Sequence, residues 1–305
     1  MFSKRNLFLS TATGLILFFS FFLSLADGKL HLVFCDVGQG DAAYVRTPSN
    51  QDLLIDGGPN DKVLDCLGKN MPFYDRTIDI VLLSHPEKDH YSGLLSVIDR
   101  YTVKYIVIPA VTNEDQGYQK LLEKIKEKKI PVKNLYSGDK FFLGKVELDI
   151  LWPGKEWVAD NLSTSLSDSS TSLRTGLKVL GLATKNTDLN YFSQYLQLRY
   201  GSFDALFPGD GDSRIQPEVM EEVSLPDVDI LKFPHHGSKY GVTDAFMDKV
   251  KPELTVISVG KNPWGHPTKE ALDILQNRSI KYLRTDQRGN IEVVSDGTGY
   301  NINNK

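Results

Sequence analysis

Short apolar runs, separated by turns rich in glycine and charged residues, dominate the chain after residue 28. Alternating or continuous apolar runs of this length predict β-strands. The predicted strands are two within 29–45 around a glycine-rich turn, 52–55, 77–84, 104–109, strand patterns within 141–152, 195–200, 205–207, 229–233, 255–258, one near Tyr282, and 291–294. Helical spacing predicts helices over 91–101, 116–129 and 269–277. Strands that alternate with helices indicate an α/β fold, which we predict as one domain over residues 28–305.

The stretch 154–190 departs from this pattern. It is rich in serine and threonine and shows no clear apolar periodicity. Such a composition predicts a long surface excursion that contains at most one helix.

The N-terminus has a different pattern again. Lys4 and Arg5 precede an uncharged apolar stretch at 7–25, and small residues precede Asp27. A basic start, an apolar middle and small residues before a cleavage point are typical of a secretory signal peptide. The apolar stretch also approaches the roughly 20 residues that span a bilayer, so a membrane anchor is the alternative for residues 1–26. In either case we expect an exported domain that is secreted, periplasmic or anchored at the outer face of the membrane.

Composition narrows the class of protein. Hydrophobic residues make up 41% and charged residues 24% of the chain, as in ordinary globular proteins. The formal net charge is −4, and no basic stripe is interleaved with aromatic residues. These features argue against a broad electrostatic grip on nucleic acid.

The chain has two cysteines, Cys35 and Cys66. Export would permit a disulfide bond between them. Because Cys35 lies in an apolar strand pattern, we expect instead that both are small buried side chains.

Four potential metal ligands lie within six residues, directly after the strand predicted at 77–84: His85, Glu87, Asp89 and His90. A strand fixes the start of the following loop, so several side chains can turn toward one point. Imidazole and carboxylate ligands together suit zinc, manganese or iron better than magnesium or calcium. The sequence therefore predicts a metal site here, with a solvated acidic turn as the alternative.

Further candidate residues follow other predicted strands. Asp210 lies on a glycine turn after 205–207, and His235 and His236 follow 229–233. His266 lies between a glycine and a proline. Each alone would be an ordinary loop residue, but together with the first cluster they indicate one distributed site.

These segments resemble the metallo-β-lactamase superfamily, in particular the hydrolase domain of the competence (DNA-uptake) proteins and its free-standing exported members. The resemblance is carried, in order along the chain, by FCDVGQGDAAYV (34–45), LLIDGG (53–58), LLSHPEKDHYSGL (82–94), NYFSQYLQLRYGSFDALFPGD (190–210), LKFPHHGSKYG (231–241), VISVGKNPWGHP (256–267) and YLRTDQRGNI (282–291). It implies an αββα four-layer sandwich, with a one- or two-metal site on the edge between its sheets.

The resemblance also implies roles for single positions. A first metal ion would be bound by His85 and Glu87. A second would be bound by Asp89 and His90, with the Asp210 carboxylate bridging the two ions.

The late histidine ligand of the family matches the pair His235 and His236. His235 is preferred as the ligand because it directly follows the strand and Pro234, and its partner could donate to a phosphate oxygen. The predicted metal ligands are therefore His85, Glu87, Asp89, His90, Asp210 and His235. The expected cofactor is Zn²⁺, as one or two ions, with Mn²⁺ as the alternative.

Two departures from the family pattern weaken the first metal site. Glu87 stands where the wider superfamily has a histidine, and no histidine occurs between His90 and His235. Asn190 or Ser193 lies where the missing mid-chain ligand would be expected. We therefore expect one ion to be held more firmly than two.

The predicted function is an exported metal-dependent phosphodiesterase that acts on nucleic acid or on an envelope phosphodiester, such as phosphocholine on teichoic acid, through a metal-activated hydroxide. Asp89, His266 and His236 are the predicted catalytic residues. Asp89 would orient the water, and the histidines would assist the developing oxyanion or the leaving group. Asp36 and Asp41 would support the site or hold their turn.

Two other functions fit the sequence less well. One is hydrolysis of a lactam, lactone or thioester, and the other is a binding protein whose metal site is degraded. The expected partner is a phosphodiester substrate, with membrane association through residues 7–25 and no predictable protein partner. A role in DNA uptake would require a separate membrane partner.

Overall fold

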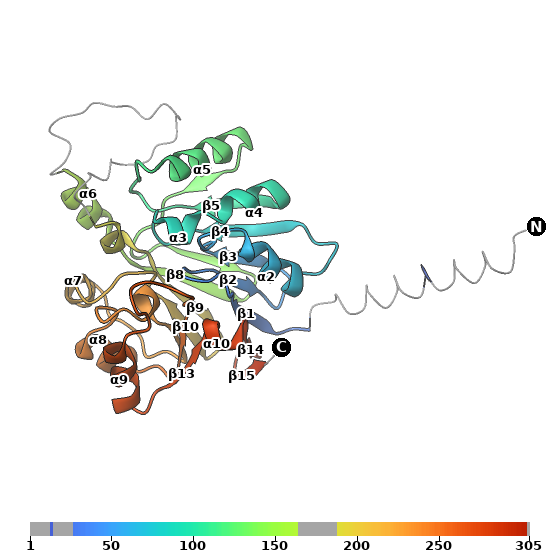
Figure 1. Ribbon diagram of the computed structural model, residues 1–305. Helices are drawn as coiled ribbons and strands as arrows, with labels where there is room; N and C mark the ends of the chain where they lie inside the picture. Colours follow the sequence, from blue (N-terminus) through green and yellow to red (C-terminus); the bar gives the residue numbers. More distant parts are fainter. Residues whose placement is uncertain (1–12, 15–26, 164–187, 304–305) are drawn as a thin grey trace, which may run out of the picture.

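The computed structural model describes residues 13–14, 27–163 and 188–303 (Figure 1). The predicted signal or anchor segment lies outside the described residues except for residues 13 and 14, as does most of the serine-rich stretch. Within the described ranges, no helix combines the length and the apolar character needed to cross a membrane.

Two β-sheets form the centre of the fold. The first has eight strands in the order β15-β14-β1-β2-β3-β4-β5-β6, and the second has seven in the order β13-β12-β11-β10-β9-β8-β7. The strands of the first sheet are β1 Leu30–Phe34, β2 Ala43–Arg46, β3 Asp52–Ile55, β4 Thr77–Leu82, β5 Thr102–Val107, β6 Val132–Lys133, β14 Ile291–Ser295 and β15 Tyr300–Asn303. Those of the second are β7 Lys140–Leu143, β8 Val146–Trp152, β9 Tyr195–Tyr200, β10 Phe203–Phe207, β11 Ile230–Lys232, β12 Leu254–Ile257 and β13 Lys281–Arg284.

Helices cover the outer faces of the two sheets, α2 to α5 on one side and α7 to α9 on the other (Figure 1). The α-helices are α2 Lys62–Asn70, α3 Lys88–Tyr91, α4 Leu94–Arg100, α5 Gln116–Glu127, α6 Lys155–Ser163, α7 Gln216–Glu222, α8 Asp244–Val250, α9 Lys269–Asn277 and α10 Thr285–Arg288. Two 3₁₀ turns, η1 Leu189–Phe192 and η2 Pro234–Gly237, complete the described elements.

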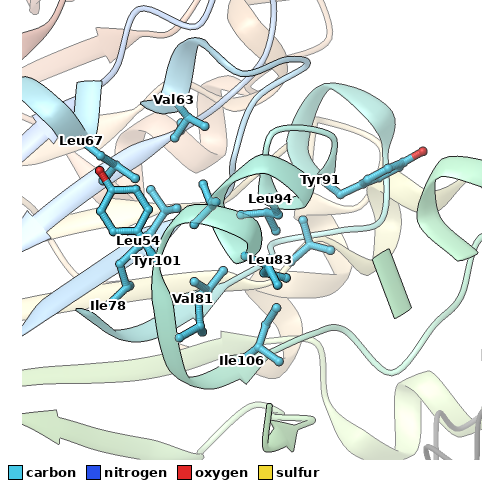
Figure 2. Packing of buried hydrophobic residues seen from close by; sticks show 14 of the residues in the cluster. Leu54, Val63, Leu67, Ile78, Val81, Leu83, Tyr91, Leu94, Tyr101 and Ile106 are labelled. Carbon is cyan, nitrogen blue, oxygen red and sulfur yellow. The ribbon is translucent and has the colours of Figure 1, made fainter. Parts of the chain in front are cut away.

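The alternation of side chains along β1 explains this layering. Leu32 and Phe34 pack in the cluster between the sheets, whereas Val33 packs in the cluster on the outer face. That outer cluster includes Leu54 of β3 and Val63 of α2 (Figure 2). Because side chains alternate between the two faces of a strand, a strand covered on both faces reads as an unbroken apolar run. The predicted αββα four-layer sandwich is confirmed.

Strand direction brings the chemistry-bearing loops to one edge of the sandwich. In the second sheet, β10, β11 and β12 are adjacent and parallel, so the loops after them leave the sheet together. In the first sheet, β4 runs parallel to both of its neighbours, β3 and β5. Asp210 lies in the segment after β10, His235 in the segment after β11 and His266 in the segment after β12. His85 follows β4.

Most predicted strands and helices are confirmed to within two residues, and β3, β9 and α9 have the predicted bounds. The helix predicted at 91–101 is wrong as a single element, because α3 and α4 are separate. Gly93 lies at the break, where a Cβ atom would come within 1.9 Å of the Gly57 carbonyl oxygen. Helices α2, α7, α8 and α10 and strands β6 and β15 were not predicted.

The prediction of two unbonded cysteines is wrong. Cys35 and Cys66 are both buried, as expected, but they form a disulfide bond. The bond joins the end of β1 to α2, and the unpredicted helix is what brings Cys66 to the strand.

Candidate metal centre

Four buried residues converge where the two sheets meet: Asp41, His90, Asp210 and His236. One ligand atom from each lies within 4.8 Å of the others. Asp41 comes from the loop between β1 and β2, His90 from α3, Asp210 from the loop after β10, and His236 from η2 after β11. The two sheets therefore contribute equally to one cluster.

His90 is held by a carboxylate behind its ring. Its Nδ1 lies 2.8 Å from Oδ2 of Asp56, and that carboxylate also accepts hydrogen bonds from the Ser84 amide and hydroxyl, both at 2.7 Å. This leaves Nε2 facing Oδ2 of Asp210 at 3.4 Å. A carboxylate that accepts the second ring N–H is the usual support of a metal-binding histidine. Burial would lower the pKa of His90, but the carboxylates of Asp210 and Asp56 raise it well above its usual value.

His236 is oriented in the same way by a backbone group. Its Nδ1 lies 3.1 Å from the carbonyl oxygen of Ser258, just after β12. Its Nε2 is 3.3 Å from Oδ2 of Asp89 and 3.3 Å from Oδ2 of Asp210. The ring thus donates behind the site and presents the other nitrogen to it.

His235 lies beside the cluster rather than in it. Its Nδ1 is 3.1 Å from Oδ2 of Asp212, and its ring packs edge-on against His266 at 5.9 Å. His235 and His236 both have left-handed backbone conformations, with φ of 52° and 54°. These two turns in succession direct the second imidazole, not the first, toward Asp210. The geometry favours His236 over the predicted His235 as the ligand.

Three histidine nitrogens in the centre are buried and lack a well-formed hydrogen bond: Nε2 of His85, His90 and His236. The His85 ring packs against that of His90 with centroids 4.1 Å apart. Burial and the neighbouring His90 lower the pKa of His85 to about 3, so its ring is neutral at pH 7. A buried polar atom without a partner costs about 1–3 kcal/mol, and a divalent metal ion would satisfy these nitrogens. The donor set therefore fits a divalent metal.

A buried lysine stands behind the cluster. Lys232, the last residue of β11, forms an ion pair with Asp41 and donates to the Gly209 carbonyl oxygen at 3.1 Å. Its Nζ is 3.5 Å from Oδ1 of Asp210. Burial would raise the pKa of Asp210, but His236, His90 and Lys232 hold it well below its usual value. The sequence analysis missed Lys232, although a lysine at the end of an apolar strand was a visible signal.

Other predicted site residues line an open cavity of about 560 Å³ beside the cluster. Glu87 and Asp89 lie on its wall with His266, whose pKa is lowered to about 4 by burial and by His235. Burial and the nearby Asp89 raise the pKa of Glu87. The lining residues are Gln39, Pro59, Glu87, Lys88, Asp89, Asn190, Asp210, His235, His236, Lys261, Pro263, Trp264 and His266.

The positions considered for the missing mid-chain ligand have different surroundings. Asn190 lines the cavity, whereas the Ser193 hydroxyl accepts a hydrogen bond from the Asp210 amide at 3.2 Å. Asp36 lies away from the cluster, with its amide bonded to Asn290 at 2.9 Å.

The chain is similar to known proteins in sequence and in fold. No family model matches the chain. ComE operon protein 3 of Bacillus subtilis is 26% identical over 95% of this chain and 36% of its own length. Competence protein ComA of Neisseria gonorrhoeae is 25% identical over 88% of this chain and 33% of its own length. The chain thus spans about a third of these relatives.

Two solved structures share the fold. The metallo-β-lactamase fold protein YhfI of B. subtilis has a TM-score of 0.51 and 12% identity, covering 87% of this chain and 99% of that one. CmlA, a diiron β-hydroxylase of Streptomyces venezuelae, has a TM-score of 0.50 and 14% identity, covering 87% of this chain and 54% of that one. The same fold thus carries different chemistries, so the reaction must be argued from the site.

The chain thus has the metallo-β-lactamase fold, with a buried Asp/His cluster that could hold a divalent metal ion. Among known sequences, the chain is similar over most of its length to competence proteins. The resemblance predicted from the sequence is confirmed.

Proposed function

We propose that this protein is an exported phosphodiesterase. The observation that carries the proposal is the set of buried Nε2 atoms of His85, His90 and His236, which lack a well-formed hydrogen bond. Those of His90 and His236 face the Asp210 carboxylate. These residues would hold a divalent metal, with Asp89 beside His236 on the cavity side. Zn²⁺ suits a donor set of this kind, and Mn²⁺ is the alternative.

A divalent ion bound by these residues would lower the pKa of water toward neutrality and would polarise a phosphoryl oxygen. The residues of the chain then position the reactants. The side chain of Asp89 contacts His236, lines the cavity and is 32% exposed, which supports a role in accepting a hydrogen bond from an attacking water. His266 is on the same wall and, being neutral at pH 7, contributes a hydrogen bond to substrate rather than a positive charge.

The cavity lining supports a phosphodiester substrate. Lys88 and Lys261 place two cations on a wall that also carries carboxylates, and Trp264 stands 65% exposed at the rim. A phosphate that bears two organic groups meets the cations with its charge and the aromatic ring with one of those groups. The similarity to competence proteins favours nucleic acid, and an envelope phosphodiester is the other candidate.

The disulfide bond supports export. Disulfides persist in secreted, periplasmic and cell-surface proteins and are rare in the reducing cytosol. The bond between Cys35 and Cys66 is therefore consistent with the signal or anchor predicted for residues 1–26.

The test is metal analysis combined with turnover of bis-p-nitrophenyl phosphate by metal-free protein to which zinc or manganese is returned. We expect metal-dependent turnover that is lost in His90→Ala and kept in His31→Ala. His31 is a matched control because it pairs with Asp27 and Glu292, away from the centre. A panel of single-stranded DNA, phosphocholine esters, a lactam and a thioester then identifies the substrate. Folded protein that turns over none of the phosphodiesters with either metal would overturn the proposal, whether or not it hydrolyses the lactam or the thioester.

A further inference from the structure

A lysine buried in the protein interior requires a specific reason. Lys232 is 3% exposed, and its ammonium group contacts Asp41, the Gly209 carbonyl oxygen and Oδ1 of Asp210. Burial of an unpaired ammonium group is so unfavourable that lysine is almost never fully buried without a partner. The chain has therefore placed a permanent cation directly behind its metal centre.

Asp41 faces the back of the histidines, not the side that would meet a metal. Its carboxylate oxygens lie 3.9 Å from Nδ1 of His90 and 3.5 Å from Nδ1 of His236. The Nε2 atoms of these two rings face Asp210 instead. Asp41 is also bonded to the segment that carries His85, Glu87, Asp89 and His90, because its amide donates to the Asp89 carbonyl oxygen at 3.2 Å. Although it is close enough to count among the ligands, Asp41 is placed as the partner of Lys232.

The two carboxylate oxygens of Asp210 face different groups, one the histidines and the other Lys232. Its Oδ2 lies 3.4 Å from Nε2 of His90 and 3.3 Å from Nε2 of His236, whereas its Oδ1 lies 3.5 Å from Lys232. A carboxylate can rotate about its last bond, so a fixed cation on one oxygen determines where the other oxygen points.

We propose that Lys232, held by Asp41, is a positioning residue that fixes Asp210 for metal binding. The ion pair has two effects. It orients Oδ2 of Asp210 toward the imidazole nitrogens, and it offsets the charge of Asp41 so that this carboxylate does not compete for the ion. The inference rests on the metal binding of the proposed function but not on the phosphodiester substrate.

The experiment compares metal-free wild type with Lys232→Met, Asp41→Asn and the double variant, measuring the melting temperature and the affinity for Zn²⁺ and Mn²⁺ by competition with a chelator. Lys232→Met leaves Asp41 buried without its cation, so we expect a large fall in melting temperature. The double variant removes both charges, and we expect it to recover most of the melting temperature. Its metal affinity should remain at least tenfold weaker than in the wild type, because nothing then orients Asp210.

The readouts separate positioning from a purely structural role. A double variant with both the melting temperature and the metal affinity of the wild type would overturn the proposal. If that variant does not fold, Asp41→Asn decides. Lys232 would then be released to pair with Asp210, and metal affinity should fall, whereas unchanged affinity would overturn the proposal. Metal affinity requires no substrate, so absence of phosphodiester turnover would leave this result intact.

Discussion

The two sheets build their halves of the metal centre in different ways. The half from the first sheet is a local network, in which Asp56 accepts hydrogen bonds from Ser84 and from the His90 ring. The half from the second sheet consists of single residues at the ends of separate strands, such as Asp210 after β10 and His236 after β11. A local network is fixed by one short segment and its neighbour, whereas the second half depends on the alignment of parallel strands.

The second half also relies on unusual backbone conformations. Both histidines of η2 have positive φ, a region that costs a non-glycine residue about 1–3 kcal/mol. Gly237 follows at φ 81°, and a Cβ atom there would come within 2.4 Å of Pro267. The segment can adopt this conformation because β11, β12 and the loop before α9 pack around it. The first half is thus held by one local hydrogen-bond network, whereas the second combines separate polar contacts with packing and an unusual backbone conformation.

Asp210 is the residue that both halves share, so its substitution should have the largest effect. We expect Asp210→Asn to lower turnover by more than the roughly 100-fold that loss of a supporting residue costs, because the residue meets His90 and His236 directly. Steady-state kinetics with matched metal content would measure the fall in turnover. Asp65→Asn, at an exposed position on α2, is the control. Wild-type metal affinity in Asp210→Asn would contradict the arrangement.

The adjacent histidines test the second half on its own. His236→Ala should lower metal affinity by more than about tenfold, because it removes a buried Nε2 that faces Asp210. His235→Ala should retain the metal and lose activity only modestly, since that ring is bonded to Asp212. Isothermal titration of both variants with the metal would measure the difference in their metal affinity. If His235→Ala loses the metal instead, His235 and not His236 is the ligand.

The features that could be predicted from the sequence differ from those that depend on tertiary packing. Side chains that follow strands in one sheet edge, such as His90 and Asp210, were found because ligand chemistry and strand ends are visible in the sequence. The choice between His235 and His236 could not be made from the sequence, because it depends on two left-handed residues whose conformation comes from tertiary packing. The ion pair of Lys232 joins positions almost two hundred residues apart, and no local pattern marks such a pair.

The supporting residues of each half offer a finer comparison. Asp56→Asn should weaken metal affinity by roughly 10–100-fold, because it removes the charge that holds His90. Ser193→Ala removes a single hydrogen bond to the Asp210 amide, worth about 0.5–1.5 kcal/mol, and should weaken affinity by about tenfold or less. Chelator competition on both variants checks the order. Equal losses would show that the two halves depend equally on polar support.

The disulfide bond should matter for stability and little for chemistry. It joins residues 31 positions apart, and closing a loop of that length in the unfolded chain corresponds to about 3–4 kcal/mol. It anchors the start of the loop that carries Asp41, but from the α2 side, away from the imidazoles. We therefore expect the double variant Cys35→Ala/Cys66→Ala to unfold at lower denaturant and to keep turnover within about twofold. Thiol titration in denaturant, with and without reductant, would verify the bond in the wild type. A loss of metal affinity in this double variant would mean that the first half is held by the covalent bond as well as by its hydrogen-bond network.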